Sequence, residues 1–189
     1  MTTKNVAIFA SGAGTNAINC IQYFDKSELI KICLIVCNNP QAGIVDYCKT
    51  AKFELALINK TTLNNEIEMI QLLNNHEIDC IVLAGFLWLI PLYLVTKFEN
   101  KMINLHPSLL PKYGGRGMYG RAVHEAVFEA KETKTGITIH YVTAEFDKGA
   151  LLIQHETNIE HGDTVTIIEE KIKMLEKEYL PAALLLAFG

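Results

Sequence analysis

Paired cysteines, proline-rich linkers and internal repeats are missing from this sequence. It has five cysteines, an odd number, and no two of them form a CxxC pair. A disulfide framework or a cysteine-based zinc site is therefore not expected, and the thiols are predicted to be reduced in a cytoplasmic protein. Only five prolines occur in 189 residues, and no low-complexity tract divides the chain. We expect a single domain over residues 1–189.

An excess of positive charge is also missing. Lysine and arginine number 17 against 21 acidic residues, which gives a formal net charge of −4. Binding to a phosphate backbone requires the opposite balance, so we expect no nucleic-acid partner. The uncharged stretch 80–95 falls short of the roughly 20 residues that a membrane span needs. Gly85 and Pro91 interrupt it, and the first apolar run, 6–10, is too short for a signal-peptide core, so no membrane association is expected.

Apolar runs typical of buried strands alternate with segments of helical periodicity. The predicted strands of the first part are 4–10, 29–37, 53–58, 79–84 and 101–105. The predicted helices between them are 16–24, 41–51 and 63–76. In the last of these, Leu63, Ile67, Ile70 and Leu73 form the expected apolar stripe. This alternation predicts an α/β fold with a doubly wound, mostly parallel, Rossmann-like sheet.

The second half of the chain mixes in antiparallel strands. Residues 136–143 alternate apolar and polar side chains, and 150–155 can pair with them through the intervening turn. A helix at 121–132 precedes these strands, and a helix at 164–180 follows them, with Asp163 as its expected N-cap. We therefore expect antiparallel additions in the C-terminal half of the sheet.

The first candidate site is the loop Ser11-Gly-Ala-Gly-Thr-Asn16, between the first predicted strand and helix. Its two glycines permit a tight turn that points successive N–H groups at one position, and the helix N-terminus adds partial positive charge. This predicts an anion site, most simply for a phosphate. Gly12, Gly14 and Ala17 also fit a dinucleotide fingerprint. The second predicted strand ends in Asn38-Asn-Pro40, without the expected carboxylate, and a nucleotide-binding domain without chemistry stays open as the alternative.

The second candidate site is the run Asn104-Leu-His-Pro-Ser-Leu-Leu-Pro111. Side chains two apart on a strand share a face, so Asn104 and His106 project together where the strand ends. An amide and an imidazole at that place can stabilise a developing oxyanion and move a proton. A third segment holds His140 and Asp147, whose carboxylate would favour a protonated His106 if the fold brought the two together. A plain hairpin turn at Asp147-Lys-Gly is the alternative.

These motifs, in this order, resemble the phosphoribosylglycinamide formyltransferases. The resemblance is carried by residues 11–16, Ala84-Gly-Phe86, 104–113 and Asp147-Lys-Gly149, and it covers nearly the whole chain. It implies the formyltransferase fold, with a phosphate-binding half at about 1–100 and a catalytic, folate-binding half at about 101–189. It also implies formyl transfer from 10-formyltetrahydrofolate, as co-substrate, to the amine of glycinamide ribonucleotide in purine synthesis. The implied partners are these small molecules, with no metal.

The resemblance further implies roles for individual residues. The catalytic residues become Asn104, His106 and Asp147, with His140 in support. The substrate phosphate and ribose would be held by Gly14, Thr15, Asn16, Lys173 and Glu176. The folate pocket would be lined by Leu87, Trp88, Leu89, Ile90, Val142, Thr143, Ala144, Glu145 and Phe146. Two places depart from the family pattern, because Trp88 stands where many members have an arginine and residues 114–121 replace a Pro-Gly segment.

The expected mechanism assigns two oxyanion donors and one carboxylate. Asn104 and a protonated His106 would donate to the oxyanion, while Asp147 would stabilise the imidazolium and organise water for proton movement. The sequence does not determine the oligomeric state.

Overall fold

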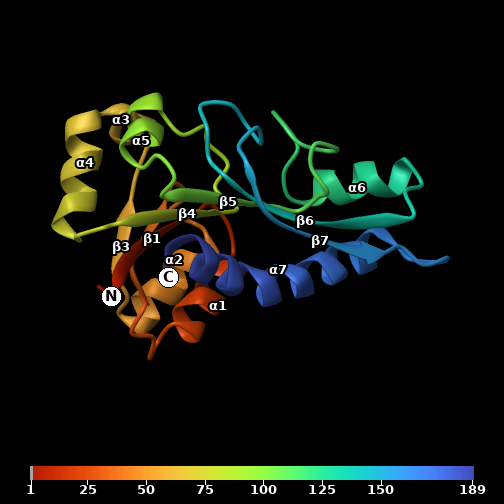
Figure 1. Cartoon of the computed structure of the whole chain (residues 1–189), viewed down its shortest axis with the longest axis horizontal. Helices are drawn as coiled ribbons and strands as arrows, with labels where there is room; N and C mark the ends of the chain where they lie inside the picture. The colour runs from red at the N-terminus through yellow and green to blue at the C-terminus, as the bar shows by residue number, and fades with distance from the viewer. Residues whose placement is uncertain (1) are drawn as a thin grey trace.

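The computed structural model describes residues 2–189, which form one seven-stranded sheet with helices on both faces (Figure 1). The strands are β1 (Lys4–Ala10), β2 (Ile30–Cys37), β3 (Leu55–Leu57), β4 (Cys80–Ala84), β5 (Met102–His106), β6 (Lys134–Tyr141) and β7 (Leu151–Asn158). The helices are α1 (Thr15–Tyr23), α2 (Gly43–Ala51), α3 (Lys60–Asn64), α4 (Glu66–Asn75), α5 (Leu92–Lys97), α6 (Arg121–Glu129) and α7 (Val165–Phe188).

The strand order is β3-β2-β1-β4-β5-β6-β7. Strands β1 to β5 pair in parallel, whereas β6 runs antiparallel to β5 and β7 antiparallel to β6. The predicted doubly wound sheet with antiparallel C-terminal additions is therefore confirmed. Because β2 and β4 lie on opposite sides of β1, the chain changes direction there, and such a switch point leaves a crevice at the carboxyl ends of the strands.

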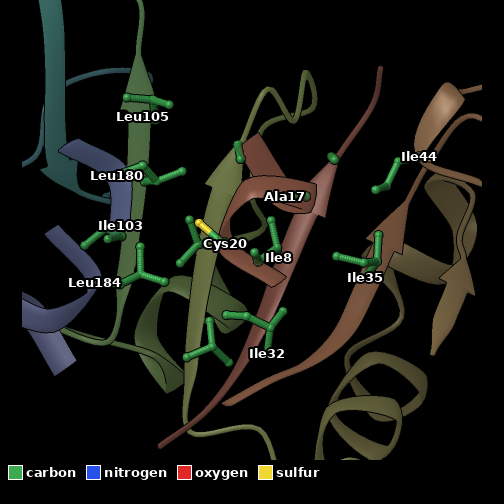
Figure 2. Packing of buried hydrophobic residues seen from close by; sticks show 14 of the residues in the cluster. Ile8, Ala17, Cys20, Ile32, Ile35, Ile44, Ile103, Leu105, Leu180 and Leu184 are labelled. Carbon is green, nitrogen blue, oxygen red and sulfur yellow. The ribbon is translucent and has the colours of Figure 1, made fainter. Parts of the chain in front are cut away.

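The core is divided by the sheet into two layers. Along β1, Ile8 packs with α1, α2 and α7 on one face, while Phe9 packs with α3, α4 and α5 on the other. Figure 2 shows the first layer, where Ala17 and Cys20 of α1 lie over the strands and Leu180 of α7 lies beside β5. Both faces of β1 are buried, which explains why its sequence is nearly continuous in apolar residues.

The helix predicted at 63–76 is two helices. The side chain of Asn59 accepts a hydrogen bond from the Thr62 backbone N–H, and that of Asn65 accepts one from the Glu68 N–H, so each asparagine caps a separate helix. Asparagine favours this position because its side chain replaces a missing backbone partner. The break also shifts the buried face. Ile67, expected to point inward, is 79% exposed, and Met69 is fully buried instead.

The last helix is longer than predicted and has a different cap. It spans Val165–Phe188, and the Thr164 hydroxyl oxygen accepts from the Ile167 N–H, whereas the Asp163 carboxylate binds Lys171. The predicted Asp163 cap is therefore wrong. The helix continues through Pro181, and the turns beyond it bury Leu184 and Phe188 among other apolar residues. That burial offsets the backbone hydrogen bond that proline cannot make.

No helix within residues 2–189 combines the length and the apolar character needed to cross a membrane.

Candidate active site

A cavity of about 550 Å³ lies at the carboxyl ends of the central strands. Its walls come from the loop after β1 with the start of α1 (residues 12–16), the loop after β4 (residues 85–90) and the end of β5. The segment 115–120, the β6–β7 connection and the facing sides of α6 and α7 complete them. This is the place that the switch point at β1 predicts, and the volume is that of a small-molecule site.

Four predicted catalytic residues meet in this cavity. Asn104 Nδ2 donates to Asp147 Oδ1 at 3.3 Å, and the same oxygen lies 3.5 Å from His106 Nδ1 and 3.5 Å from His140 Nε2. The second carboxylate oxygen accepts from the Gly115 backbone N–H at 2.7 Å. Asn104 and His140 are directly paired across β5 and β6, which brings their side chains together. We call Asn104, His106, His140 and Asp147 the Asp147 cluster.

The tautomer of His140 follows from its neighbours. Its Nδ1 lies 2.8 Å from the Tyr141 carbonyl oxygen, so Nδ1 carries the proton and donates. Nε2 of the neutral ring is then an acceptor, and Asn104 Nδ2 donates to it at 3.1 Å. Both N–H groups of the Asn104 amide therefore donate within the cluster, one to His140 and one to Asp147.

His106 is 4% exposed, and its Nε2 lies 2.8 Å from the Tyr113 carbonyl oxygen, to which it donates. Burial lowers the pKa of His106 below its ordinary value, although the Asp147 charge and the Tyr113 carbonyl act in the opposite direction. This direction favours the neutral ring, in which the lone pair of Nδ1 faces Asp147. The protonated His106 expected from the sequence stays a prediction.

Asp147 is held by a strained turn and by contacts on both oxygens. Its φ of 55° is left-handed. Burial alone would raise the pKa of this carboxyl group, but the contact with His140, the positive charge of His106 in its protonated form and the Gly115 N–H together keep its pKa below its ordinary value. Asp147 therefore stays ionised at neutral pH. Sequence reasoning missed Gly115 and Tyr113, which act through a backbone N–H and a backbone carbonyl rather than through side chains that a pattern could reveal.

The glycine loop leaves the N-terminus of α1 open toward the cavity. Gly14 is the N-cap residue of α1, with a left-handed φ of 74° and no side-chain cap. Its neighbours Thr15 and Asn16 line the cavity with it. The first N–H groups of a helix have no intrahelical partners and attract anions, so this end of the cavity suits a phosphate.

We expect Gly14→Ala to reduce the free energy of unfolding by about 1–3 kcal/mol, measured by urea denaturation. The new Cβ would sit in a left-handed conformation and 2.5 Å from Ile44 Cβ. Gly12→Ala is the matched control, since a Cβ there meets nothing within 4 Å. Equal stability of the two variants would contradict the interpretation that the loop requires glycine at position 14.

Two residues of α7 close the phosphate end of the cavity. Glu176 Oε2 accepts from Asn16 Nδ2 at 2.9 Å, and burial raises the pKa of the Glu176 carboxyl group, with the Asn16 hydrogen bond opposing it. Lys173 lines the same wall, but its ammonium donates to Glu169 at 2.6 Å. All five predicted substrate-binding residues therefore line one cavity: Gly14, Thr15, Asn16, Lys173 and Glu176.

The mouth of the cavity is apolar. Of the residues predicted to bind folate, those that line the cavity are Leu87, Trp88, Leu89, Ile90, Val142, Thr143, Glu145 and Phe146. Ala144 is exposed and is not among the residues that line the cavity, so its place in the folate pocket stays a prediction. The Trp88 ring packs edge-on against Phe86, and the Lys60 ammonium lies 5.9 Å from its centre. Among residues 2–189, no group of three or more His, Cys, Asp or Glu side chains has the arrangement of a metal site.

Residues 4–184 match the family model described as formyl transferase. The chain belongs to the formyl transferase family. Solved structures of phosphoribosylglycinamide formyltransferases resemble this chain over nearly its whole length. The enzyme from Bacillus halodurans has a TM-score of 0.86 and 34% identity, covering 97% of this chain and 94% of that one. Glycinamide ribonucleotide transformylase 1 from Geobacillus kaustophilus has a TM-score of 0.87 and 29% identity, covering 99% and 100%.

Curated relatives of this formyl transferase carry related names. The chain is 32% identical over 175 residues to the chloroplastic phosphoribosylglycinamide formyltransferase of Arabidopsis thaliana, covering 89% of this chain and 60% of that protein. It is 31% identical over 184 residues to the human trifunctional purine biosynthetic protein adenosine-3, covering 95% of this chain. The chain spans only 18% of the human protein's length.

Proposed function

We propose that this protein transfers a formyl group from 10-formyltetrahydrofolate to the amine of 5-phosphoribosylglycinamide. One observation carries the proposal: a single cavity has an open helix N-terminus at one end and the Asp147 cluster at the other. A ribonucleotide phosphate bound at α1 would direct the amine of the same molecule toward the cluster. The names of the relatives support this choice of substrate.

The proposed reaction forms one C–N bond and breaks another. An α-amino group has a pKa of about 7.7 to 8.0, so a fraction of the substrate amine is unprotonated at neutral pH and can attack the formyl carbon. The electron pair of the C=O bond then moves to oxygen, and this oxyanion needs donors. When the C–N bond to the folate breaks, the formyl oxygen regains its double bond and the departing folate nitrogen takes a proton.

His106 and Asp147 supply the proton relay in this proposal. The neutral ring has its free lone pair on Nδ1, because Nε2–H is held by the Tyr113 carbonyl. Nδ1 accepts the proton released by the attacking nitrogen, and the resulting imidazolium lies 3.5 Å from the Asp147 carboxylate, which stabilises it. The same proton is then passed to the departing nitrogen. The ring returns to its neutral form, so charge and protons balance over one cycle.

Asn104 is the oxyanion donor in this proposal. Both of its N–H groups are hydrogen-bonded inside the cluster, to His140 and Asp147. Donation to the substrate oxygen therefore requires that one of these bonds be exchanged. The 3.3 Å bond to Asp147 is the longer of the two, and His106 competes for the same carboxylate oxygen once it is protonated. Proton transfer to His106 and release of the Asn104 N–H are thus linked.

The apolar mouth is the proposed folate pocket. Leu87, Leu89 and Phe146 are 44%, 47% and 36% exposed around it, which is unusual for large apolar side chains and suits a flat aromatic ring. The Leu87 backbone N–H donates to the Ser11 hydroxyl at 3.1 Å, so this segment is tied to the phosphate loop. Both halves of the chain contribute to this one cavity, which supports the single-domain organisation that we propose.

A cytoplasmic location is a further part of the proposal. All five cysteines are free, and burial raises the pKa of the Cys20 thiol to about 12. Free, unreactive thiols fit a reducing compartment.

The test of the proposed function is a spectrophotometric assay with glycinamide ribonucleotide and a 10-formyl folate, with His106→Ala beside the wild type. Formation of tetrahydrofolate that depends on the ribonucleotide supports the proposal, and its absence contradicts it. Thermal stabilisation by NAD(P) but not by folates would instead favour a dinucleotide-binding domain.

We expect Asn16→Ala to raise the KM for the ribonucleotide roughly tenfold or more, because hydrogen bonds to charged groups are among the strongest. Its kcat is expected to change little. Steady-state kinetics with the ribonucleotide varied provides the measurement. Asn19→Ala on the same helix is the matched control, since Asn19 Nδ2 donates to the Lys177 carbonyl on the surface. An unchanged KM for Asn16→Ala would remove Asn16 from the phosphate site.

The pH profile of kcat/KM distinguishes a neutral from a protonated resting His106. If both the substrate amine and His106 must be unprotonated, log kcat/KM rises with slope one just below the amine pKa of about 7.7. The plot of log kcat/KM against pH becomes steeper only at lower pH, where His106 is protonated as well, because burial lowers the His106 pKa below 6.5. In His106→Asn the steeper limb is expected to disappear. A profile that falls above pH 6.5 would instead indicate that the protonated ring is required.

A further inference from the structure

A second charged group lines the cavity, on the wall formed by α6 and α7. Glu169 stands at its centre, with Oε1 2.6 Å from the Lys173 ammonium and Oε2 3.5 Å from the Arg121 guanidinium. His124 is their neighbour on α6, and all four side chains line the cavity. The contact between Arg121 and Glu169 was not expected from the sequence, because the two residues come from helices that meet only in the folded chain.

His124 brings a buried ring nitrogen without a hydrogen-bond partner to this wall. The ring is 4% exposed, and its Nδ1 atom has no hydrogen-bond partner within the part of the chain that the structure describes. Buried polar atoms without partners are uncommon in native proteins. Burial lowers the pKa of His124, with Glu169 acting against it and Lys173, Arg121 and His106 acting with burial. The N-terminus of α6 likewise has no side-chain cap and no acidic residue in its first turn.

Lys173 has two competing partners. In the proposed function it binds the substrate phosphate, yet in the free protein its ammonium is already bound by a carboxylate. We propose that Glu169 is a placeholder for the phosphate: its carboxylate holds Lys173 in the free protein and gives way when the phosphate arrives, while remaining paired with Arg121. This inference rests on the proposed function, in which a phosphate binds beside Lys173.

The geometry favours the change of the Lys173 partner from Glu169 to the phosphate. Glu169 and Lys173 are one turn apart on α7 and their side chains are 24% and 56% exposed, so the pair is of the weak, solvent-screened kind. Once Lys173 turns to the phosphate, Arg121 still offers Glu169 a partner. Arg121 is the first residue of α6, and the segment before it supplies the Gly115 N–H that Asp147 accepts.

The test is Glu169→Gln, which removes the charge and keeps the shape. We expect inorganic phosphate to bind roughly three- to tenfold more tightly at low ionic strength, the scale of losing one carboxylate at ion-pair distance in water. The KM for the ribonucleotide should fall by a similar factor with kcat unchanged. The gain should shrink as salt is added, because exposed charges are screened. Isothermal titration calorimetry with inorganic phosphate gives the first measurement.

Two comparisons isolate the placeholder role. Glu125→Gln makes the same change in charge and also removes a partner of Arg121, at 3.0 Å, but Glu125 does not line the cavity, so phosphate affinity should match the wild type. In a Lys173→Met background, Glu169→Gln should give no gain, because there is no ammonium to release.

The inference is overturned if Glu169→Gln binds inorganic phosphate no more tightly than the wild type, or if the gain persists without Lys173. Calorimetry does not depend on turnover, so the two proposals fail separately. No formyl transfer by the wild type, together with tighter phosphate binding by Glu169→Gln, removes the proposed function and keeps the placeholder. Normal turnover with unchanged phosphate affinity removes the placeholder and keeps the function.

Discussion

Asp147→Asn is expected to lower kcat by about 10²- to 10⁴-fold, the usual cost of removing a group that takes part in proton transfer. The carboxylate touches three side chains and the Gly115 N–H, so it is the common partner of the cluster. Asparagine has the same shape but no charge. The imidazolium that forms at His106 during the reaction would then lie in a buried site without a counter-ion, which raises the barrier.

The KM for the ribonucleotide should stay close to the wild-type value, because the phosphate end of the cavity is formed by other residues. Asp46→Asn on α2 is the matched control, with the same chemical change at an exposed position. Circular dichroism and thermal melting establish that both variants are folded. A kcat for Asp147→Asn less than about tenfold below the wild type would place the proton relay elsewhere, since general acid–base groups contribute at least 10²-fold.

Asn104→Ala is expected to lower kcat by about 10²- to 10³-fold, the typical loss for one oxyanion donor. No other side chain of the cluster offers an amide N–H, and His106 Nε2 and His140 Nδ1 already donate to the backbone carbonyls of Tyr113 and Tyr141. Binding of the ribonucleotide should change little. Single-turnover kinetics with saturating substrates measures the chemical step directly.

Asn64→Ala, which removes a surface hydrogen bond to the Lys60 carbonyl, is the control for this variant. The double variant Asn104→Ala/Asp147→Asn should lose less than the product of the two single losses, because the two side chains are hydrogen-bonded and act as a unit. Equal loss of phosphate affinity and turnover in Asn104→Ala would refute its assignment as an oxyanion donor.

Local patterns were sufficient for most of the fold. The central strands are buried on both faces, so their sequences are continuous in apolar residues and stand out from the segments between them. Predictions failed where a side chain had two possible uses. Asn65 could sit inside a helix or cap one, and it caps α4. Pro181 could end a helix or be carried within one, and the apolar residues after it keep α7 helical.

In the candidate site, too, some of the arrangement could be predicted from neighbouring residues and some could not. Asn104 and His106 are two residues apart on one strand, so their common direction was visible in the sequence. Asp147 lies 43 residues beyond Asn104 in the sequence, and the pairing of β5 with β6 brings it close to these two side chains. The link between Arg121 and Glu169 likewise depends on how α6 meets α7.

The order of strands and helices along the chain, the glycine loop before α1 and the residue types of the Asp147 cluster could be predicted from the sequence, because each is encoded in neighbouring residues. The folded chain is needed to show that burial lowers the pKa of His106 and that Arg121 of α6 pairs with Glu169 of α7. Burial and this ion pair both depend on groups that are far apart along the chain and meet only after folding.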